Sequence, residues 1–286
     1  MKSICFGEIL YDVFPSYEVL GGAPLNAAVH LARLGGESFV ISSVGNDDRG
    51  RRALEEIRAN GLSAETISRS SNPTGIAEIT IRDGNADYEF NDPCAWDDIS
   101  LTEDAEKVLL SGVDAVVFGT LASRSSSNRA MLRRILSSKA RTVLFDVNFR
   151  KSFYSADLVK EGIGCSDILK INEEEKERVE ALLAIDDVRE LFDDYPGLKF
   201  ILLTKGEKGL SLYERGCVYG RCAKDRGFVD TVGAGDSVTA AFLYFYLKGY
   251  PIEIILDKAA ELASIVVASS GATSPYPEGF LETFLE

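Results

Sequence analysis

The chain alternates short apolar runs with stretches in which apolar residues recur at helical spacing. Most of the apolar runs are continuous, which is typical of parallel strands that are covered on both faces of a sheet. We predict strands at residues 4–6, 39–41, 115–118, 142–145, 167–169 and 200–203. Helical patterns lie near residues 24–35, 48–60, 102–110, 127–137, 155–163 and 173–183. This order predicts an α/β fold, a three-layer, doubly wound sheet with mostly parallel strands.

One region departs from this order and reads as strand, turn, strand. Ile79 and Ile81 alternate with polar residues, and Asp83-Gly84 is a pair typical of hairpin turns. A second extended pattern lies close to the start of the chain. We predict that residues of about 12–20 and 65–98 form a small antiparallel β lid over a ligand, within a single domain of residues 1–286. The alternative is an edge hairpin that only extends the main sheet.

Composition narrows the function classes. Asp and Glu total 45 against 31 Lys and Arg, so the net charge is −14, which argues against binding to nucleic acid or an anionic membrane. No apolar run approaches the ~20 residues that span a bilayer, and the start of the chain does not resemble a signal peptide. The five cysteines lack CxxC spacing, which favours reduced thiols in the cytoplasm. The single histidine, His30, argues against Ser-His-Asp hydrolysis and multi-histidine metal centres.

The most informative stretch is DTVGAGD at residues 230–236, which opens a long apolar helix. The free N–H groups at a helix N-terminus, together with the helix dipole, form a site for an anion. A carboxylate in this position can simply stabilise the first turn of the helix. Beside a bound phosphate, however, Asp236 would be suited to accept a proton from an attacking hydroxyl, so phosphoryl transfer and the structural role are both open.

A second glycine-rich stretch, GGAPLN at residues 21–26, also leads into a helix, with Pro24 near the first helical position. Asn26 is the polar exception on an apolar opening turn, which suits a hydrogen bond to a ligand hydroxyl. A tight turn that packs small residues is the alternative. The P-loop and dinucleotide-binding fingerprints are both absent from the sequence.

Taken together, the two stretches resemble the signatures of the ribokinase-like (PfkB) family of carbohydrate kinases, in the right order and about 200 residues apart. Within the family the chain is most similar to bacterial fructokinases, which the GEILYD stretch at residues 7–12 also resembles. The resemblance implies that Asp236 is the catalytic base. It further implies an anion hole made by the backbone N–H groups of Gly233, Ala234 and Gly235, and contacts to sugar hydroxyls from Asp12, Gly22 and Asn26.

Further segments resemble nucleotide and metal motifs of the family. The resemblance implies that Thr204 and Gly206 contact the nucleotide, that Gly233 and Gly235 do so too, and that Asn172 and Glu175 organise Mg²⁺ through water. An N-cap with an acidic first turn is the alternative for that NEEE segment. Arg150, in DVNFR, would bind the sugar or the phosphoryl group, or else form a salt bridge with Asp146. Relatives also bind K⁺ near the positions of Asp230, Val232 and Gly271.

The chain departs from the fructokinase pattern at Leu25 and Ala28, and Ala260 falls near a position that flanks the adenine in relatives. Tyr88 and Trp96 of the expected lid would stack on a sugar or serve in packing. We expect an ATP- and Mg²⁺-dependent sugar kinase that acts on fructose and forms a homodimer through the lid. The alternatives are a 2-keto-3-deoxygluconate, ribose or nucleoside kinase, and a non-catalytic nucleotide- or sugar-binding regulatory protein.

Overall fold

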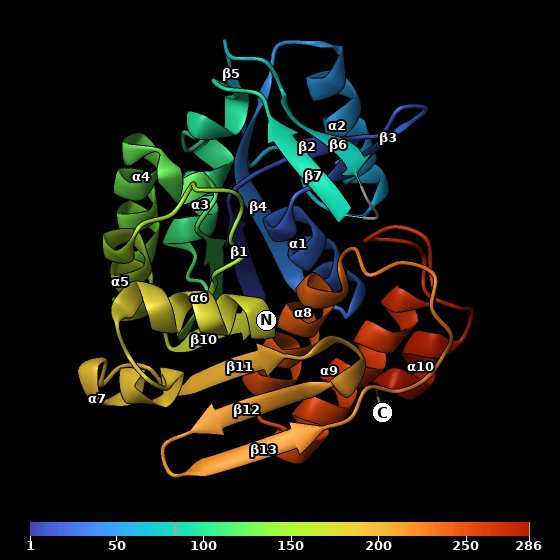
Figure 1. Cartoon of the computed structure of the whole chain (residues 1–286). Coiled ribbons are helices and arrows are strands. Elements are labelled where there is room, and N and C mark those ends of the chain that lie inside the picture. The colour runs from blue at the N-terminus through green and yellow to red at the C-terminus, as the bar shows by residue number, and fades with distance from the viewer. Residues whose placement is uncertain (83–84, 286) are drawn as a thin grey trace.

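The structure, a computed structural model, describes residues 1–82 and 85–285, and their side chains outside residues 80–88. Its larger sheet has the strand order β13-β12-β11-β10-β9-β8-β1-β4-β5 (Figure 1). All neighbours pair in parallel except at the β11–β12–β13 edge, where pairing is antiparallel. The strands are β1 (Lys2–Phe6), β4 (Glu37–Gly45), β5 (Ile67–Ser70), β8 (Ala115–Gly119), β9 (Thr142–Asp146), β10 (Ile168–Asn172), β11 (Phe200–Thr204), β12 (Leu210–Glu214) and β13 (Cys217–Arg221).

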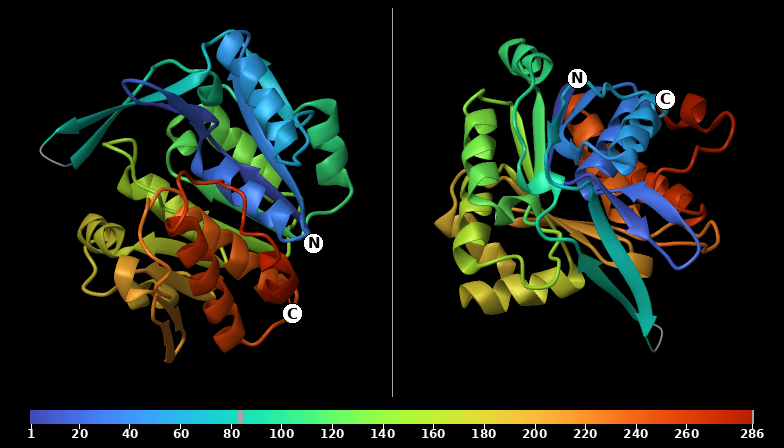
Figure 2. Two further views of the ribbon diagram at one scale, coloured as in Figure 1. Left: turned by 90° about the vertical axis from the view of Figure 1, so that its right-hand side faces the viewer. Right: turned by 90° about the horizontal axis from the view of Figure 1, so that it is seen from above.

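Helices cover both faces of this sheet and form the two outer layers of the fold, which the right-hand view of Figure 2 shows from above. One face is covered by α1 (Ala23–Arg33), α2 (Asp48–Ala59), α8 (Ala234–Leu247), α9 (Ile252–Val267) and α10 (Phe280–Phe284). The other is covered by α3 (Glu103–Leu110), α4 (Ser126–Leu136), α5 (Ala156–Gly164), α6 (Glu173–Leu183) and α7 (Leu191–Asp194). The three-layer, doubly wound prediction is therefore confirmed.

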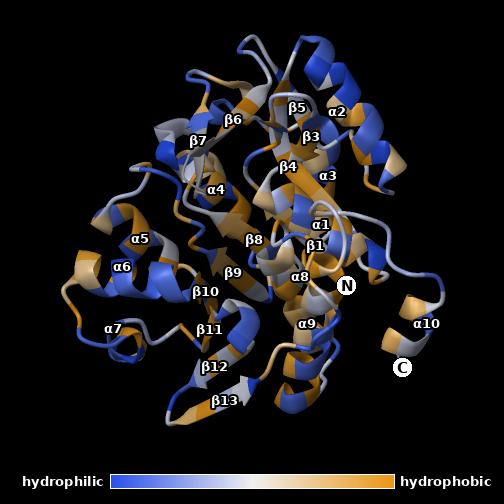
Figure 3. Cartoon of the chain, turned by 45° about the vertical axis from the view of Figure 1, so that its right-hand side comes forward, coloured by the Kyte–Doolittle hydropathy of each residue, from blue (hydrophilic) through white to orange (hydrophobic). Residues whose placement is uncertain are grey.

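Burial follows the sequence pattern. Apolar residues concentrate on the strands of the large sheet, whereas α2 and α6 present mostly polar surfaces (Figure 3). Each sheet face has its own core, one around Phe242 of α8 and the other around Phe145 of β9, and both of these side chains are fully buried. Short polar side chains cap the starts of α2, α3, α5 and α6; at α2, for example, Asp47 accepts a hydrogen bond from the N–H of Gly50 at 2.7 Å.

The expected small sheet is present and consists of β2 (Leu10–Val13), β3 (Glu18–Gly21), β6 (Gly75–Arg82) and β7 (Asn85–Phe90), in the order β3-β2-β6-β7. The pairs β2–β3 and β6–β7 are antiparallel, while β2 and β6 pair in parallel. Both views of Figure 2 show β6 and β7 extending away from the body of the molecule.

The predicted bounds of the lid need one correction. Residues 67–70 form β5, which pairs in parallel with β4 and so belongs to the large sheet. Its serines are buried, and the Ser68 hydroxyl donates to the carbonyl oxygen of Ser42 at 3.1 Å. Because this strand is short and polar, its sequence lacks the apolar pattern of a buried strand.

Among the described residues, no helix has the length and apolar character needed to cross a bilayer. Helix α8 is the most apolar candidate, and it is only 14 residues long.

Candidate active site

Residues from distant parts of the chain meet where the parallel strands of the large sheet end. Glu8 follows β1, Asp146 ends β9 and Asn172 ends β10. The first turn of α8 brings in Asp236, and α1 brings in Asn26 (Figure 1). The carboxyl ends of the strands in a doubly wound sheet are where such folds bind ligands.

Asp236 and Asn26, the two polar residues singled out in the signature stretches, are in direct contact. The Nδ2 of Asn26 donates to Oδ2 of Asp236 at 2.8 Å. Burial raises the pKa of Asp236 to about 6, although the ammonium of Lys170 acts in the opposite direction. The Asn26 amide also favours the charged form of the carboxylate. Asp236 is therefore a partly buried carboxylate in a fixed orientation, as a general base requires.

The turn before Asp236 has one feature that suits an anion site and one that does not. Gly233 caps α8 with a φ of 79°, in the left-handed region that favours glycine. A Cβ at Gly233 would also lie 2.5 Å from the Cα of Ala272. The N–H of Ala234 donates to the carbonyl oxygen of Thr231 at 3.2 Å, so this N–H would have to exchange partners in order to join an anion hole.

The GGAPLN stretch contains two glycines that no larger residue could replace without movement. Gly22 has a φ of 117°, and a Cβ there would lie 2.3 Å from the carbonyl oxygen of Glu8. A Cβ at Gly21 would lie 2.9 Å from Oδ2 of Asp12. Burial raises the pKa of Asp12 to about 6. The structure thus places Asp12 beside Gly21, and Gly22 beside Glu8, at the join of β2, β3 and α1.

Arg150 lies toward the carboxylates of this region. Its charge lowers the pKa values of Glu8, Asp12 and Asp236, each of which is raised by burial. Its Nη1 donates to the carbonyl oxygen of Phe149 at 3.1 Å. The salt bridge considered for Asp146 is made by another residue, because Lys170 Nζ lies 2.8 Å from Asp146 Oδ2.

Lys170 is a site residue that the sequence analysis missed. It is 7% exposed, and a Cβ at Gly235 would lie 2.9 Å from its Nζ, so the ammonium lies against the first turn of α8. Burial opposes its charge, but Asp146, Glu175 and Asp236 together hold its pKa above the usual value. A lysine in an otherwise apolar strand was the available signal, since buried lysines are almost always paired.

Asn172 and Glu175 form a reciprocal cap at the start of α6. Asn172 Oδ1 accepts from the N–H of Glu175 at 2.8 Å, and Glu175 Oε2 accepts from the N–H of Asn172 at 2.9 Å. The second oxygen of Glu175 accepts from the N–H of Phe149 at 3.0 Å. The capping alternative for this segment is therefore what the structure shows, and a metal role for Glu175 would have to operate through water.

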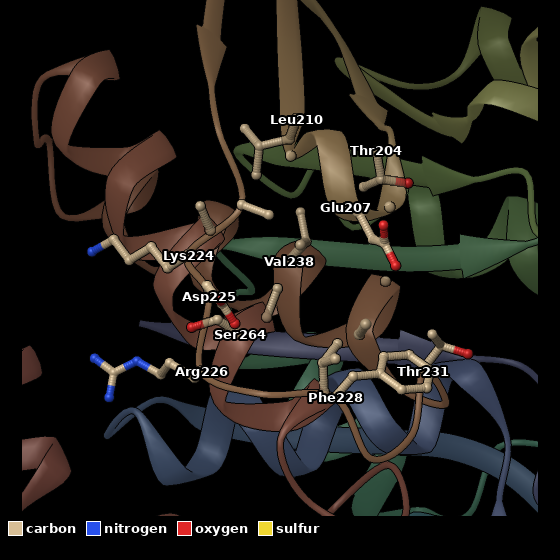
Figure 4. Close-up of a pocket in the computed structure, with 18 of the residues that line it drawn as sticks. Thr204, Glu207, Leu210, Lys224, Asp225, Arg226, Phe228, Thr231, Val238 and Ser264 are labelled. Carbon is tan, nitrogen blue, oxygen red and sulfur yellow. The ribbon is translucent and has the colours of Figure 1, made fainter.

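A cavity of about 570 Å³ lies between the β11–β12 edge and helices α8 and α9. Thr204 and Gly206 line it, as expected, and so do Ala234 and Gly235. Figure 4 shows Thr204, Glu207 and Thr231 at one end, with Lys224 and Arg226 at the other. These two cations both pair with Glu261, each at 2.9 Å.

The middle of this cavity is apolar. Its lining includes Leu210, Phe228, Val238, Ala260, Ala263 and Val267. Ala260, which the sequence analysis placed beside a nucleotide base, is thus a wall residue. A largely apolar cavity of several hundred Å³ with polar groups at its ends is typical of small-molecule sites.

The possible cation residues also lie together. Asp230 Oδ1 accepts from the N–H of Val232 at 3.0 Å, and its Oδ2 accepts from the N–H of Gly271 at 3.2 Å. Among the residues that the structure describes, no group of three or more His, Cys, Asp or Glu side chains could hold a metal ion.

The two aromatic residues expected in the lid have different outcomes. Trp96 is fully buried in a cluster with Cys94, Leu121 and Ala122, so its role is packing and not sugar stacking. A Cβ at Gly75 would lie 2.3 Å from its Nε1, which places Trp96 beneath the base of β6. The side chain of Tyr88 lies outside the described residues.

Glu8 is the second residue that the sequence analysis did not assign. It is 3% exposed, and its buried Oε2 has no hydrogen-bond partner among the residues that the structure describes. Burial raises its pKa from the usual 4.5 to about 7, and Asp236 and Asp146 act in the same direction. A carboxylate between two apolar residues just after a buried strand was its signal in the sequence.

We expect Glu8→Gln to change how stability depends on pH. Because the folded pKa is raised, the contribution of Glu8 to stability is fully present below about pH 4.5 and is lost as the pH rises to about 7. The free energy of unfolding of the variant relative to wild type should therefore increase by about 3 kcal/mol between pH 4.5 and 8. Urea unfolding at a series of pH values measures this change.

Glu55→Gln, at an exposed position of α2, is the control. It should change the free energy of unfolding relative to wild type by less than about 0.5 kcal/mol over the same pH range. If the difference in the free energy of unfolding between Glu8→Gln and wild type did not change with pH, the pKa of Glu8 would not be raised in the folded protein.

Comparison with known proteins agrees with this geometry. The chain matches the model of the pfkB family carbohydrate kinases over residues 9–279. It is 28% identical to fructokinase-2 of Solanum lycopersicum, with 92% of this chain and 86% of that protein covered. It is 27% identical to a 5-dehydro-2-deoxygluconokinase of Clostridium perfringens, with 90% and 81% covered. The ATP-bound fructokinase of Xylella fastidiosa superposes with a TM-score of 0.87 at 21% identity, over 99% of this chain and 98% of that one. With its signature stretches, its cavity and the partly buried Asp236 carboxylate close together, the chain belongs to the PfkB family of carbohydrate kinases.

Proposed function

We propose that this sugar kinase transfers the γ-phosphoryl group of ATP to a primary hydroxyl of fructose. The observation that supports the proposal is that one short segment borders two sites. Ala234 and Gly235 line the cavity, while the next residue, Asp236, is bonded to Asn26 on the opposite side. ATP in the cavity and a sugar beside Asn26 would therefore meet at Asp236.

In this proposal Asp236 accepts the proton of the attacking sugar hydroxyl. The hydroxyl oxygen then bonds to the γ-phosphorus, and the bond from phosphorus to the bridging oxygen breaks, which leaves ADP. With a pKa of about 6, Asp236 is mostly ionised at neutral pH and can take up the proton. The bond from Asn26 holds one carboxylate oxygen, which leaves the other for the substrate.

The turn at Gly233 and Gly235 and the N-terminus of α8 would stabilise the charge on the transferring group. Preorganised N–H donors at a helix N-terminus do this without reorganisation during the reaction. The ammonium of Lys170, which lies against Gly235, adds a fixed positive charge nearby. Because Lys170 is paired with Asp146, its position is fixed before substrate binds.

The residues present fit Mg²⁺ held mainly by phosphates and water. Both oxygens of Glu175 already accept backbone N–H groups, so Glu175 and Asn172 would hold the ion through water. When bound with ATP, Mg²⁺ offsets the negative charge of the phosphates. We also propose a K⁺ site at the backbone of Asp230, Val232 and Gly271, which the two hydrogen bonds of the Asp230 carboxylate draw together.

The sugar would bind between Asp12, Gly22, Asn26 and Arg150. Carboxylate acceptors and amide and guanidinium donors around one space suit a polyol, whose hydroxyls both donate and accept. The small sheet lies beside these residues, and its closure over the sugar would exclude water that could otherwise hydrolyse ATP. The homodimer expected through this sheet stays a prediction; Tyr17 and Val19, at its edge, are 56% and 41% exposed.

Acceptor specificity is tested by the release of ADP from MgATP with a set of acceptors. The set contains fructose, 2-keto-3-deoxygluconate, 5-dehydro-2-deoxygluconate, ribose, glucose and adenosine. We expect the highest kcat/KM for fructose, by about tenfold or more, since a site built to bind hydroxyls rejects acceptors that leave its polar groups unpaired. The Asp236→Asn variant supplies the background rate of ATP hydrolysis. Preference for a keto-acid would support the similarity to the 5-dehydro-2-deoxygluconokinase instead, and release of ADP without any acceptor dependence would contradict the proposal.

A further inference from the structure

The only histidine of the chain, His30, has no role in the chemistry described above. It lies in the middle of α1, one helical turn after Asn26, and is fully buried. Residues four apart on a helix share a face. The face of α1 that carries Asn26 to Asp236 therefore also carries His30.

His30 contacts the segment after α9 through both ring nitrogens. Nε2 lies 2.9 Å from the carbonyl oxygen of Ala272, and Nδ1 lies 2.6 Å from the hydroxyl oxygen of Tyr276. Because a carbonyl can only accept, Nε2 carries the proton and Nδ1 accepts from Tyr276. Burial lowers the pKa of His30 to about 4, so the ring is neutral and keeps this arrangement at neutral pH. The two rings are also stacked, with centroids 5.8 Å apart.

Arg33, a turn further along α1, binds the same segment. Its guanidinium donates to the carbonyl oxygens of Thr273 and Ser274 at 2.7 and 2.8 Å, and lies 5.4 Å from the centre of the Tyr276 ring. Residues 272–276 are thus bound to α1 by side chains of one helix face.

Residues 272–276 also contact the turn at Gly233, where we propose the anion hole. A Cβ at Gly233 would lie 2.5 Å from both Cα and Cβ of Ala272, so the two backbones are in close contact. On the preceding residue, the N–H of Gly271 donates to Asp230. A displacement of Ala272 would therefore allow Gly233 and the N-terminus of α8 to move.

We propose that His30 and Tyr276 are positioning residues for phosphoryl transfer, which hold Ala272 against Gly233 and so fix the anion-hole turn relative to the Asn26–Asp236 pair. The inference rests on the proposed function. In this proposal two side chains of α1 orient the reacting groups. Asn26 orients the base, and His30 orients the N–H donors of the anion hole. A shift of about 1 Å in such donors can cost about 100-fold in rate.

The first test compares kcat and the sugar KM of three variants with those of wild type, using the best acceptor. His30→Ala should lower kcat about 10–100-fold with the sugar KM changed less than about threefold. His30→Gln keeps a donor and an acceptor and should recover at least half of the loss on a logarithmic scale. Val29→Ala removes core packing from the same helix but none of the hydrogen bonds from His30 and Arg33 to residues 272–276, and it should lower the melting temperature while leaving kcat within about twofold.

The proposal would be overturned by a His30→Ala kcat within about twofold of wild type, or by an equal fall of kcat in Val29→Ala. Should His30→Ala fail to fold, the comparison rests on His30→Gln and on Tyr276→Phe, which removes only the hydroxyl that donates to Nδ1. Tyr276→Phe should lower kcat several-fold at an unchanged sugar KM, and no change would count against the proposal.

A second measurement is independent of turnover. Since the chain has one histidine, ¹⁵N-histidine labelling gives a single pair of ring-nitrogen signals. We expect the Nε2–H tautomer, and signals that shift when MgADP is added, because the nucleotide would bind against the turn that His30 helps to hold. Signals that are unmoved by saturating MgADP would contradict the inference. Failure of every sugar as a substrate, with the signals still shifted by MgADP, would instead contradict the proposed function alone.

Discussion

Replacing Asp236 by asparagine is expected to lower kcat by about 10²–10⁴-fold, while the binding of MgATP and sugar is retained. The amide is close to the carboxylate in shape but cannot accept the proton of the sugar hydroxyl. It can still receive the hydrogen bond from Asn26 through its oxygen. Release of ADP at saturating substrates gives kcat, and calorimetry gives the two affinities.

Asp157→Asn is the matched control for this substitution. Asp157 also lies in the first turn of a helix, α5, but it is exposed and on the other face of the large sheet, so the kcat of the variant should stay within about twofold of wild type. If Asp236→Asn kept more than about a tenth of the wild-type kcat, Asp236 would not be the base. The carboxylate of Asp236 would then have only the structural role of an acid in the first turn of a helix.

The second large effect is expected on stability, from Lys170→Met. Removing the ammonium leaves Asp146, which is 5% exposed, without its ion-pair partner. An unpaired buried charge of this kind costs about 3–5 kcal/mol. Urea unfolding should therefore show a free energy of unfolding lower by that amount. The pKa of Asp236 should also rise, because Lys170 holds it down in the wild type.

Two further variants are controls for the loss of stability in Lys170→Met. Lys199→Met removes an exposed lysine that pairs with Asp167 at 2.9 Å, and it should cost only about 0–1 kcal/mol. The double variant Lys170→Met with Asp146→Asn removes both charges, and it should be more stable than Lys170→Met alone. A Lys170→Met variant as stable as Lys199→Met would mean that Asp146 finds another partner or takes up a proton without cost.

The βαβ part of the fold could be predicted because its strands are apolar and lie between amphipathic helices. The hairpin β12–β13 was not predicted, because its two strands do not share an apolar pattern. Leu210 and Leu212 face the core, but Val218 on the outer strand is 58% exposed, so the pair lacks a common apolar pattern. The strand β5 also lacks an apolar pattern, and the sequence analysis therefore assigned it to the lid and not to the large sheet. Strands at the edge of a sheet are specified by their partners more than by their own residues.

For the site, the sequence was informative where glycine or a helix start imposes a local geometry. The stretches around Gly22 and Gly233 are examples, and their contacts with Glu8 and Ala272 explain the need for glycine. It was uninformative where a role depends on a partner far along the chain. Lys170 is held by its ion pair with Asp146 on a neighbouring strand. His30 is held by its contact with Ala272, which is 242 residues away in the sequence. The capping geometry of Asn172 and Glu175, in contrast, is local and was among the alternatives that the sequence left open.

The bond between Asn26 and Asp236 joins positions 210 residues apart, and this has a consequence for the order in which the protein can mature. During synthesis, three of the four residues that would bind the sugar, Asp12, Gly22 and Asn26, emerge early, and the proposed base emerges only in the last fifth of the chain. Helix α1 packs on β1 and β4, which are made early, but its contacts with α8 can form only after α8 is made. Contacts of such long range form late and slow folding. A ribosome-bound chain that lacks α8 would thus lack the base and the anion hole that we propose, so the ability to consume ATP would arise only after every strand of both sheets has been made.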